Sequence, residues 1–145
     1  SEVGMVFQQF NLFPHLSVLD NLILGPMKAR GLSRADATER AMHYLKRVRI
    51  PEQADKRPAQ LSGGQQQRVA VARAVVGDQA MILADEPTGN LDSSHGQEVM
   101  EMLQALNDEG VTIIMVTHSP AHADYAKRTI NLFDGHVVTE NVRAA

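Results

Sequence analysis

Short, continuous apolar runs recur along this chain, and their length predicts strands. The runs lie at residues 3–7, 81–84 and 111–116. Apolar runs of about four to eight residues are typical of strands that are buried in a sheet. We therefore expect all three to be buried strands, and the run at 81–84 to be buried on both faces.

Capping residues and apolar residues at helical spacing predict a helix in the first half. Ser33 suits an N-cap with Asp36 at the N3 position, and the helix after it extends to about residue 49. A shorter apolar segment precedes it at residues 18–24. We expect Gly25-Pro26 to end that segment, because this dipeptide is typical of turns.

Two longer helices are predicted farther along the chain. The first begins after Ser62 and extends to Gly77. The second has Ser93 or Ser94 as its expected N-cap, and Gly110 stands where a helix end favours a left-handed residue.

The last part of the chain carries a short helix and a hairpin signal. Ser119-Pro120 is an N-cap followed by proline at the first helical position. Two apolar runs, at residues 129–133 and 136–139, flank Asp134-Gly135. This arrangement predicts two antiparallel strands joined by a tight turn.

The order of these elements predicts an α/β protein with three segments. Strands and helices alternate after residue 77, which indicates a parallel sheet. We expect a core strand and loop in residues 1–16, an inserted helical subdomain in 17–76, and the rest of the α/β core in 77–145.

Composition narrows the possible functions. The net charge is only -3, so no broad basic surface is expected and no nucleic-acid partner is predicted. The chain has no cysteine, which excludes disulfides and thiolate metal sites. No apolar run approaches the roughly 20 residues that a membrane-spanning helix needs.

Residues 61–68, LSGGQQQR, place a serine and two glycines at the start of a predicted helix. Free N–H groups at a helix start attract anions, and Gly63 and Gly64 let a phosphate approach the backbone closely. A plain serine cap followed by a glycine turn is the alternative for Ser62-Gly63-Gly64 alone.

Polar side chains follow each of the three predicted strands. Gln8 follows the first, Asp85-Glu86 the second, and His118 the third. In α/β proteins ligands bind at the carboxyl edge of the sheet, where such residues lie. The alternatives are a solvated acidic turn for Asp85-Glu86 and a helix-capping role for His118. Gln9, the next residue along the chain, is the alternative to Gln8 as the site glutamine.

Together these motifs resemble the ATP-binding subunit of an ABC transporter. Residues 61–68 match the signature sequence of that family, residues 81–86 resemble its Walker B strand, and residues 87–92 resemble its D-loop. The resemblance implies a P-loop NTPase-like core with a mostly parallel sheet and an inserted α-helical signature subdomain. The match corresponds to the C-terminal two-thirds of such a domain, so we expect the core to be incomplete.

The resemblance also implies roles for the candidate residues, with ATP and Mg²⁺ as cofactors. Asp85 would hold Mg²⁺, Glu86 would polarise the attacking water, and His118 would contact the γ-phosphate. Gln8 would approach both Mg²⁺ and that water. The residues that would complete the nucleotide site of the opposite subunit are Ser62, Gly63, Gly64, Gln65 and Asp92.

Partners and location follow from the same resemblance. We expect a second ATPase subunit, forming a dimer, and transmembrane permease subunits that dock beside residues 9–19. The expected location is cytoplasmic, peripheral at the inner face of the cell membrane. Residues 4–16 look like importers of polar amino acids, whereas residues 84–93 look like the macrolide-export and lipoprotein-release class, so the cargo stays open.

One family motif, the phosphate loop G-x-x-x-x-G-K-[ST], does not occur in the sequence. We therefore expect this chain, as a fragment, neither to bind ATP tightly nor to hydrolyse it. The alternative function is an inactive, truncated remnant that acts only as a partner-binding module. A soluble ABC ATPase that acts on DNA or ribosomes is disfavoured, because no coiled-coil insertion or basic extension is present.

The remaining histidines show no spacing typical of metal ligands. We expect them to be structural or solvated, and they are His15, His43, His95, His122 and His136.

Overall fold

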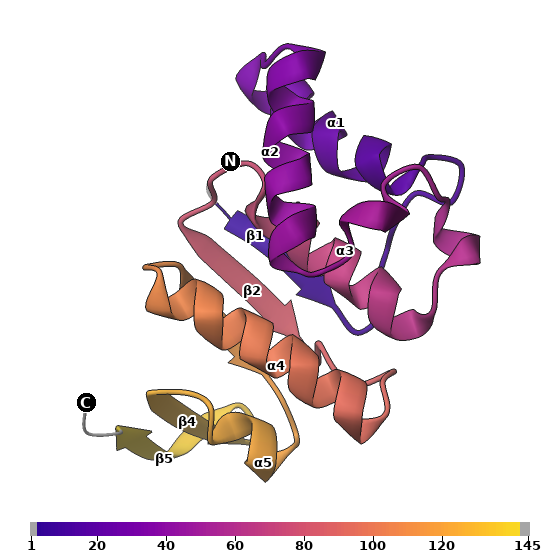
Figure 1. Cartoon of the computed structure of the whole chain (residues 1–145). Helices are drawn as coiled ribbons and strands as arrows, with labels where there is room; N and C mark the ends of the chain where they lie inside the picture. The colour runs from indigo at the N-terminus through magenta and orange to yellow at the C-terminus, as the bar shows by residue number, and fades with distance from the viewer. Residues whose placement is uncertain (1–2, 143–145) are drawn as a thin grey trace.

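A three-stranded parallel sheet with helices on one side forms the body of the protein (Figure 1). The computed structural model describes residues 3–142. The strands lie in the order β1-β2-β3, and they are β1 Val3–Phe7, β2 Met81–Asp85 and β3 Thr112–Val116. Their register pairs Phe7 with Asp85 and Asp85 with Val116, so all three strands end together.

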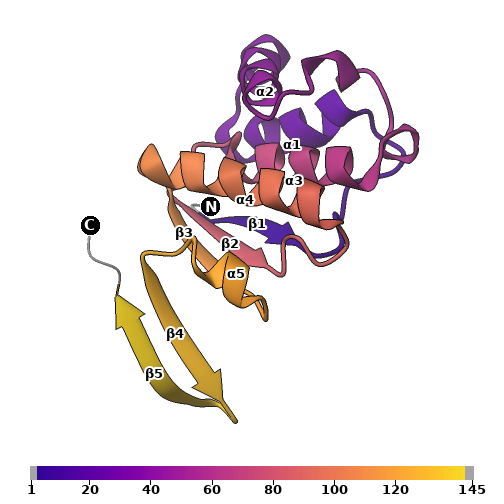
Figure 2. The same cartoon turned by 60° about the horizontal axis from the view of Figure 1, so that its bottom comes forward.

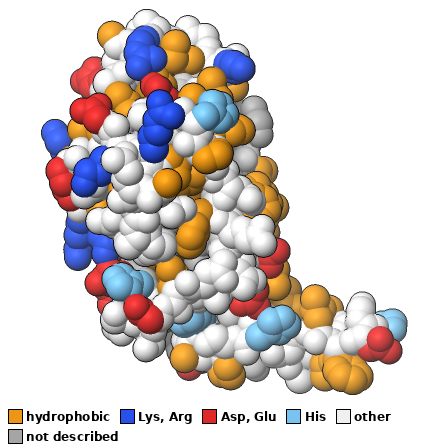
Figure 3. Space-filling model, turned by 90° about the vertical axis from the view of Figure 1, so that its right-hand side faces the viewer, with side chains coloured by type: hydrophobic (Ala, Val, Ile, Leu, Met, Phe, Trp, Pro, Cys, Tyr) orange, Lys and Arg blue, Asp and Glu red, His pale blue; other side chains and the backbone are white. Residues whose placement is uncertain are grey.

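Helices make up the other layer, and a hairpin completes the described chain. The longer helices are α1 Val18–Arg30, α2 Arg34–Arg47, α3 Gly63–Val75 and α4 Ser93–Asp108. The short ones are η1 Pro51–Gln53, η2 Pro58–Gln60 and α5 Pro120–Ala123. The hairpin consists of β4 Arg128–Phe133 and β5 His136–Val142, and it extends away from the body (Figures 2 and 3).

Helices α3 and α4 lie side by side over one face of the sheet (Figure 2). Side chains on that face, such as Val6 and Ile82, are fully buried against them. The closest approach is at Gly4, where an added Cβ atom would lie 2.0 Å from the carbonyl oxygen of Ala74. The parallel sheet predicted from the sequence is thus confirmed.

The opposite face of the sheet is largely open, which contradicts the burial predicted for the strands. In β2, Ile82 and Ala84 are buried whereas Met81 and Leu83 are only partly so. In β3, the side chain of Ile114 is 49% exposed. The prediction of burial on both faces was wrong because the longer helices α1, α2, α3 and α4 all lie over a single face (Figure 2), and an apolar run does not reveal what covers it.

The predicted end of the first helical segment at Gly25-Pro26 was also wrong. Helix α1 continues through Pro26 to Arg30. Proline removes one helical hydrogen bond without stopping the helix, and the end comes at Gly31, whose φ of 66° is left-handed. Its N–H group donates to the carbonyl oxygen of Pro26.

Most other predicted boundaries hold within one or two residues. Ser33 caps α2, which ends at Arg47 and not at 49. The cap of α4 is Asp92, not Ser93 or Ser94, because its carboxylate accepts from the N–H group of His95. The hairpin turn is confirmed by positive φ angles of 52° at Asp134 and 78° at Gly135.

None of the helices in residues 3–142 combines the length and the apolar character needed to cross a bilayer.

Candidate functional site

The carboxyl ends of the three parallel strands bring four predicted site residues to one edge of the sheet. Asp85 ends β2 and is exposed, and Glu86 follows it. Gln8 comes directly after β1, and His118 lies two residues beyond β3. The register at this edge confirms that Asp85 and His118 lie on the same rim, as the strand pattern predicted.

Glu86 is held in an unusual backbone conformation at this edge. Its φ angle is 44°, and its N–H group donates to the carbonyl oxygen of Val116 at 2.9 Å. The Oε1 atom is buried and accepts no hydrogen bond from any described residue. The exposed imidazole of His118 lies beside it, with Nε2 3.5 Å from Oε1. This oxygen therefore has acceptor capacity free for a water molecule or a cation.

Gln8 lies against the turn that follows β2, which we call the acid turn (residues 86–92). Its Nε2 donates to Oδ1 of Asn90 at 3.4 Å, and Nδ2 of Asn90 donates back to the Gln8 carbonyl at 3.0 Å. A Cβ atom on Gly89 would lie 2.6 Å from Cδ of Gln8. The glutamine is thus held beside the segment that carries Glu86.

A buried glutamine, Gln67, ties α3 to two of these strand ends. Its Nε2 donates to the carbonyl oxygen of Phe7 at 3.0 Å and also to that of Pro87. Its side chain is fully buried. Gln67 was not predicted as a site residue, although it lies on the same helical face as the buried Ala70, Val71 and Ala74.

Arg73, two turns farther along α3, holds the loop after β1. Its guanidinium donates to the carbonyl oxygens of Asn11 at 2.7 Å and Phe10 at 3.1 Å. Burial lowers the pKa of Arg73, because a charged group loses hydration there. Arg73 and Gln67 together fix the position of the loop from a single helix.

Thr88 and His122 join the acid turn to α5. Thr88 is buried, and its Oγ1 lies 3.0 Å from Nδ1 of His122. The pair spans 34 positions of sequence, so no local pattern could have indicated it. His122 has the structural role that was expected of it.

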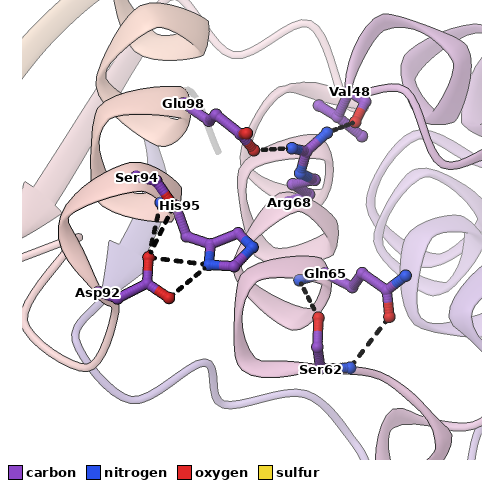
Figure 4. Close-up of polar contacts among 8 residues, drawn as sticks. All are labelled: Val48, Ser62, Gln65, Arg68, Asp92, Ser94, His95 and Glu98. Atoms are coloured by element: carbon purple, nitrogen blue, oxygen red, sulfur yellow. Dashed lines mark hydrogen bonds and ion pairs between the residues drawn. The ribbon is translucent and has the colours of Figure 1, made fainter.

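The second group of predicted residues forms the signature turn (residues 62–65) at the start of α3. Oγ of Ser62 accepts from the N–H group of Gln65 at 3.2 Å, and Oε1 of Gln65 accepts from that of Ser62 at 3.0 Å (Figure 4). This capping box leaves the N–H groups of Gly63 and Gly64 without a partner inside the described part of the chain. Gly63 is half-buried and lies outside the packed core, whereas Gly64 is buried.

Asp92 points its carboxylate into the first turn of α4. It accepts from the N–H group of His95 at 2.9 Å, from Oγ of Ser94 at 3.1 Å, and from the His95 ring (Figure 4). The backbone and side-chain hydrogen bonds of His95 lower the pKa of Asp92 to about 2. Asp92 is therefore ionised at neutral pH, and the His95 ring that it holds lies against Gly64 of the signature turn.

The acids at the sheet edge suit Mg²⁺ only as part of a nucleotide complex. Over residues 3–142, no three His, Cys, Asp or Glu side chains come together as a metal site. Mg²⁺ is usually held by one or two carboxylates together with the phosphates of a substrate. The exposed carboxylate of Asp85 and the unbonded oxygen of Glu86 fit that donor set.

A cleft of about 370 Å³ lies elsewhere, between the segment after β3 and the hairpin. Of the predicted site residues it is lined by His118 alone. We assign the site by the strand ends and not by this cleft, because parallel sheets bind ligands at that edge.

Comparison with known proteins places these features in a family. Residues 1–89 match the family model described as ABC transporter. The chain is 50% identical over 145 residues to the general L-amino acid transport ATP-binding protein AapP of Rhizobium johnstonii, covering 99% of this chain and 56% of that protein. It is 46% identical over 142 residues to the macrolide export ATP-binding/permease protein MacB of Syntrophobacter fumaroxidans, covering 97% of this chain and 20% of that protein.

A solved structure shows the same fold. It is the dimeric structure of a post-hydrolysis state of the ATP-binding cassette MJ0796 bound to ADP and Pi, with a TM-score of 0.86 and 41% identity. The match covers 100% of this chain and 64% of that one. The incomplete cassette core expected from the motifs is thus confirmed, and the chain spans about half the length of AapP. The chain belongs to the ABC transporter family.

Proposed function

We propose that this chain is the part of an ATP-binding transport subunit that carries the hydrolytic acids and the signature turn. The observation that carries this proposal is the buried, unbonded Oε1 of Glu86 at the common end of three parallel strands, 3.5 Å from His118. A carboxylate oxygen in this setting is suited to accept a proton from water.

Each residue at the sheet edge has its own role in the proposed hydrolysis. Glu86 accepts a hydrogen bond from the attacking water and orients it, while the exposed imidazole of His118 donates to the terminal phosphate. Gln8, held beside Asn90, supports the same water. Asp85 would hold Mg²⁺, which would neutralise phosphate charge when it is bound with ATP.

The signature turn contacts a different ATP molecule from the one that lies beside Glu86. The unpaired N–H groups of Gly63 and Gly64 lie at the start of α3, where Gly64 contacts His95, the partner of Asp92. Free N–H groups at a helix start attract anions. Two copies of the subunit would therefore be needed to enclose each ATP. The dimeric state of the similar cassette, bound to ADP and Pi, supports this arrangement.

Membrane subunits are the proposed partners of the loop after β1. Asn21 fixes this loop, because its Oδ1 accepts from the N–H group of Phe13 at 2.7 Å and its Nδ2 donates to the carbonyl of Leu16. Phe13 remains 46% exposed on it. A rigid loop with an exposed aromatic side chain suits a helix of a permease, which would place the subunit at the inner face of the membrane.

The isolated chain is proposed to be inactive, because the phosphate loop motif is absent from its sequence. A chimera tests both statements. In it, this chain replaces the matching 145 residues of AapP, to which it is 50% identical. We expect the chimera to hydrolyse ATP and the isolated chain to show neither turnover nor tight ATP binding.

The outcomes of this experiment are distinct. A folded chimera without ATPase activity, beside active AapP, would reject the hydrolytic role of these residues. Turnover by the isolated chain would reject its proposed inactivity and leave the role of the residues intact.

A further inference from the structure

His95 lies between the acid turn and the signature turn (Figure 4). It is in the first turn of α4, three residues after Asp92, and its ring extends toward α3. The proposed function gives it no part.

One edge of the His95 ring is held by Asp92. Nδ1 lies 2.9 Å from Oδ1 and 2.8 Å from Oδ2 of that carboxylate. An ionised carboxylate only accepts hydrogen bonds, so Nδ1 must carry a proton and donate. The tautomer and the orientation of the ring are therefore set by the last residue of the acid turn.

The other edge of the ring lies against Gly64. A Cβ atom on Gly64 would be 2.9 Å from Cδ2 of His95 and 3.2 Å from Cγ. Only a glycine leaves room for the imidazole at this distance. The ring thus rests on the backbone that presents one of the two free N–H groups of the signature turn.

A second contact holds the same two helices one turn farther on. Arg68 of α3 forms an ion pair with Glu98 of α4, and its other nitrogen donates to the carbonyl of Val48 at 3.1 Å (Figure 4). The side chain of Arg68 is only 15% exposed. This ion pair holds α3 and α4 at a fixed spacing. A displacement of Asp92 is therefore transmitted to α3 through the His95 ring.

We propose that His95 is a positioning residue that couples the acid turn to the N–H groups of Gly63 and Gly64. Through it, the position of the turn after Glu86 sets the orientation of the donors in the signature turn. The use of those donors for phosphate rests on the proposed function, whereas the coupling itself does not.

The coupling is tested by NMR on the 145-residue chain. Asp92→Asn keeps a good N-cap for α4 but weakens the hydrogen bond that orients the His95 ring. We expect this variant to shift the amide signals of Gly63 and Gly64 well beyond those of Gly31 and Gly110, which serve as controls. In a His95→Phe background the same substitution should no longer shift them. Unmoved signals in the first comparison, or equal shifts in both, would overturn the proposal.

The consequence for function is tested in the AapP chimera. We expect Asp92→Asn and His95→Phe each to lower kcat roughly tenfold with little change in KM, and the double variant to be no worse than either single one. His43→Phe, an exposed position on α2, is the matched control and should leave kcat unchanged. Additive losses would contradict the coupling. A chimera that is inactive before any substitution would reject the proposed function, and the NMR comparison would still decide the role of His95.

Discussion

Glu86 and His118 face each other across the ends of adjacent strands, with 3.5 Å between Oε1 and Nε2. The oxygen is buried and receives no hydrogen bond from the described part of the chain, whereas the imidazole is 95% exposed. The acid is thus fixed by the fold, and the histidine stays open to a ligand.

We expect Glu86→Gln to lower ATP hydrolysis by the AapP chimera roughly 10²–10⁴-fold while nucleotide binding is kept, because the amide does not accept a proton from water. Single-turnover rates and nucleotide affinity measure the two effects. Glu52→Gln, at an exposed position in η1, is the control and should have the wild-type rate. A wild-type rate for Glu86→Gln would remove Glu86 from the role of base.

Gln67→Ala should destabilise the fold by about 2–4 kcal/mol, because it opens a cavity and leaves the carbonyl oxygens of Phe7 and Pro87 without their donor. Urea unfolding of the isolated chain measures the loss. Gln66→Ala is the matched control, since Gln66 is only half-buried and donates to a single carbonyl, that of Leu61. An equal loss of unfolding free energy in the two variants would show that the contacts of the buried Gln67 side chain do not stabilise the fold more than the single contact of Gln66.

The prediction of local structure succeeded where the signal was local. Ser33 and Ser119 were predicted as caps because capping depends on a hydroxyl group and the next three residues, and both accept the predicted hydrogen bond. Ser62, for which a plain cap was only the alternative, also caps its helix. The hairpin at Asp134-Gly135 was equally local, because two positive φ angles define the turn.

The predictions that failed concern burial and contacts that depend on segments far away in the sequence. Burial of Met81 and Ile114 depends on what covers the second face of the sheet, which an apolar run does not encode. Gln67 and His122 have partners that no spacing predicts, because their contacts form between separate elements. The same holds for the packing of His95 on Gly64. The residues of the sheet edge were found because parallel strands end together, but their roles stay predictions.

Two glycines should respond differently to alanine. At Gly25, inside α1, an added Cβ meets nothing within 4 Å beyond its own helix, but Pro26 follows and disfavours the helical conformation for a residue that has a Cβ. Gly25→Ala should therefore change the stability of the chain by less than about 0.5 kcal/mol, because this clash offsets the usual gain. At Gly4 the same atom would lie 2.0 Å from the Ala74 carbonyl, so Gly4→Ala should cost roughly 1–3 kcal/mol or more. Thermal unfolding compares them, and a stabilising Gly4→Ala would contradict the close packing of α3 on β1.

Asp92 should make stability depend on pH in the acid range. Its pKa is lowered from 3.8 to about 2 in the folded chain, so its contribution is present above pH 3.8 and is lost as the pH falls toward about 2. We therefore expect the stability advantage of the wild type over Asp92→Asn to shrink across that interval. Chemical unfolding at several pH values measures it, and a constant difference would show that the carboxylate is not held by His95.

The ties from α3 to the loop after β1 have a mechanical consequence. The carbonyls of Phe10 and Asn11 are held by Arg73, and that of Phe7 by Gln67, so the loop takes its position from the helix. The same helix begins with the glycines of the signature turn. A force applied to the loop would then be transmitted along α3 to its first turn, where we propose that the N–H groups of Gly63 and Gly64 bind a phosphate.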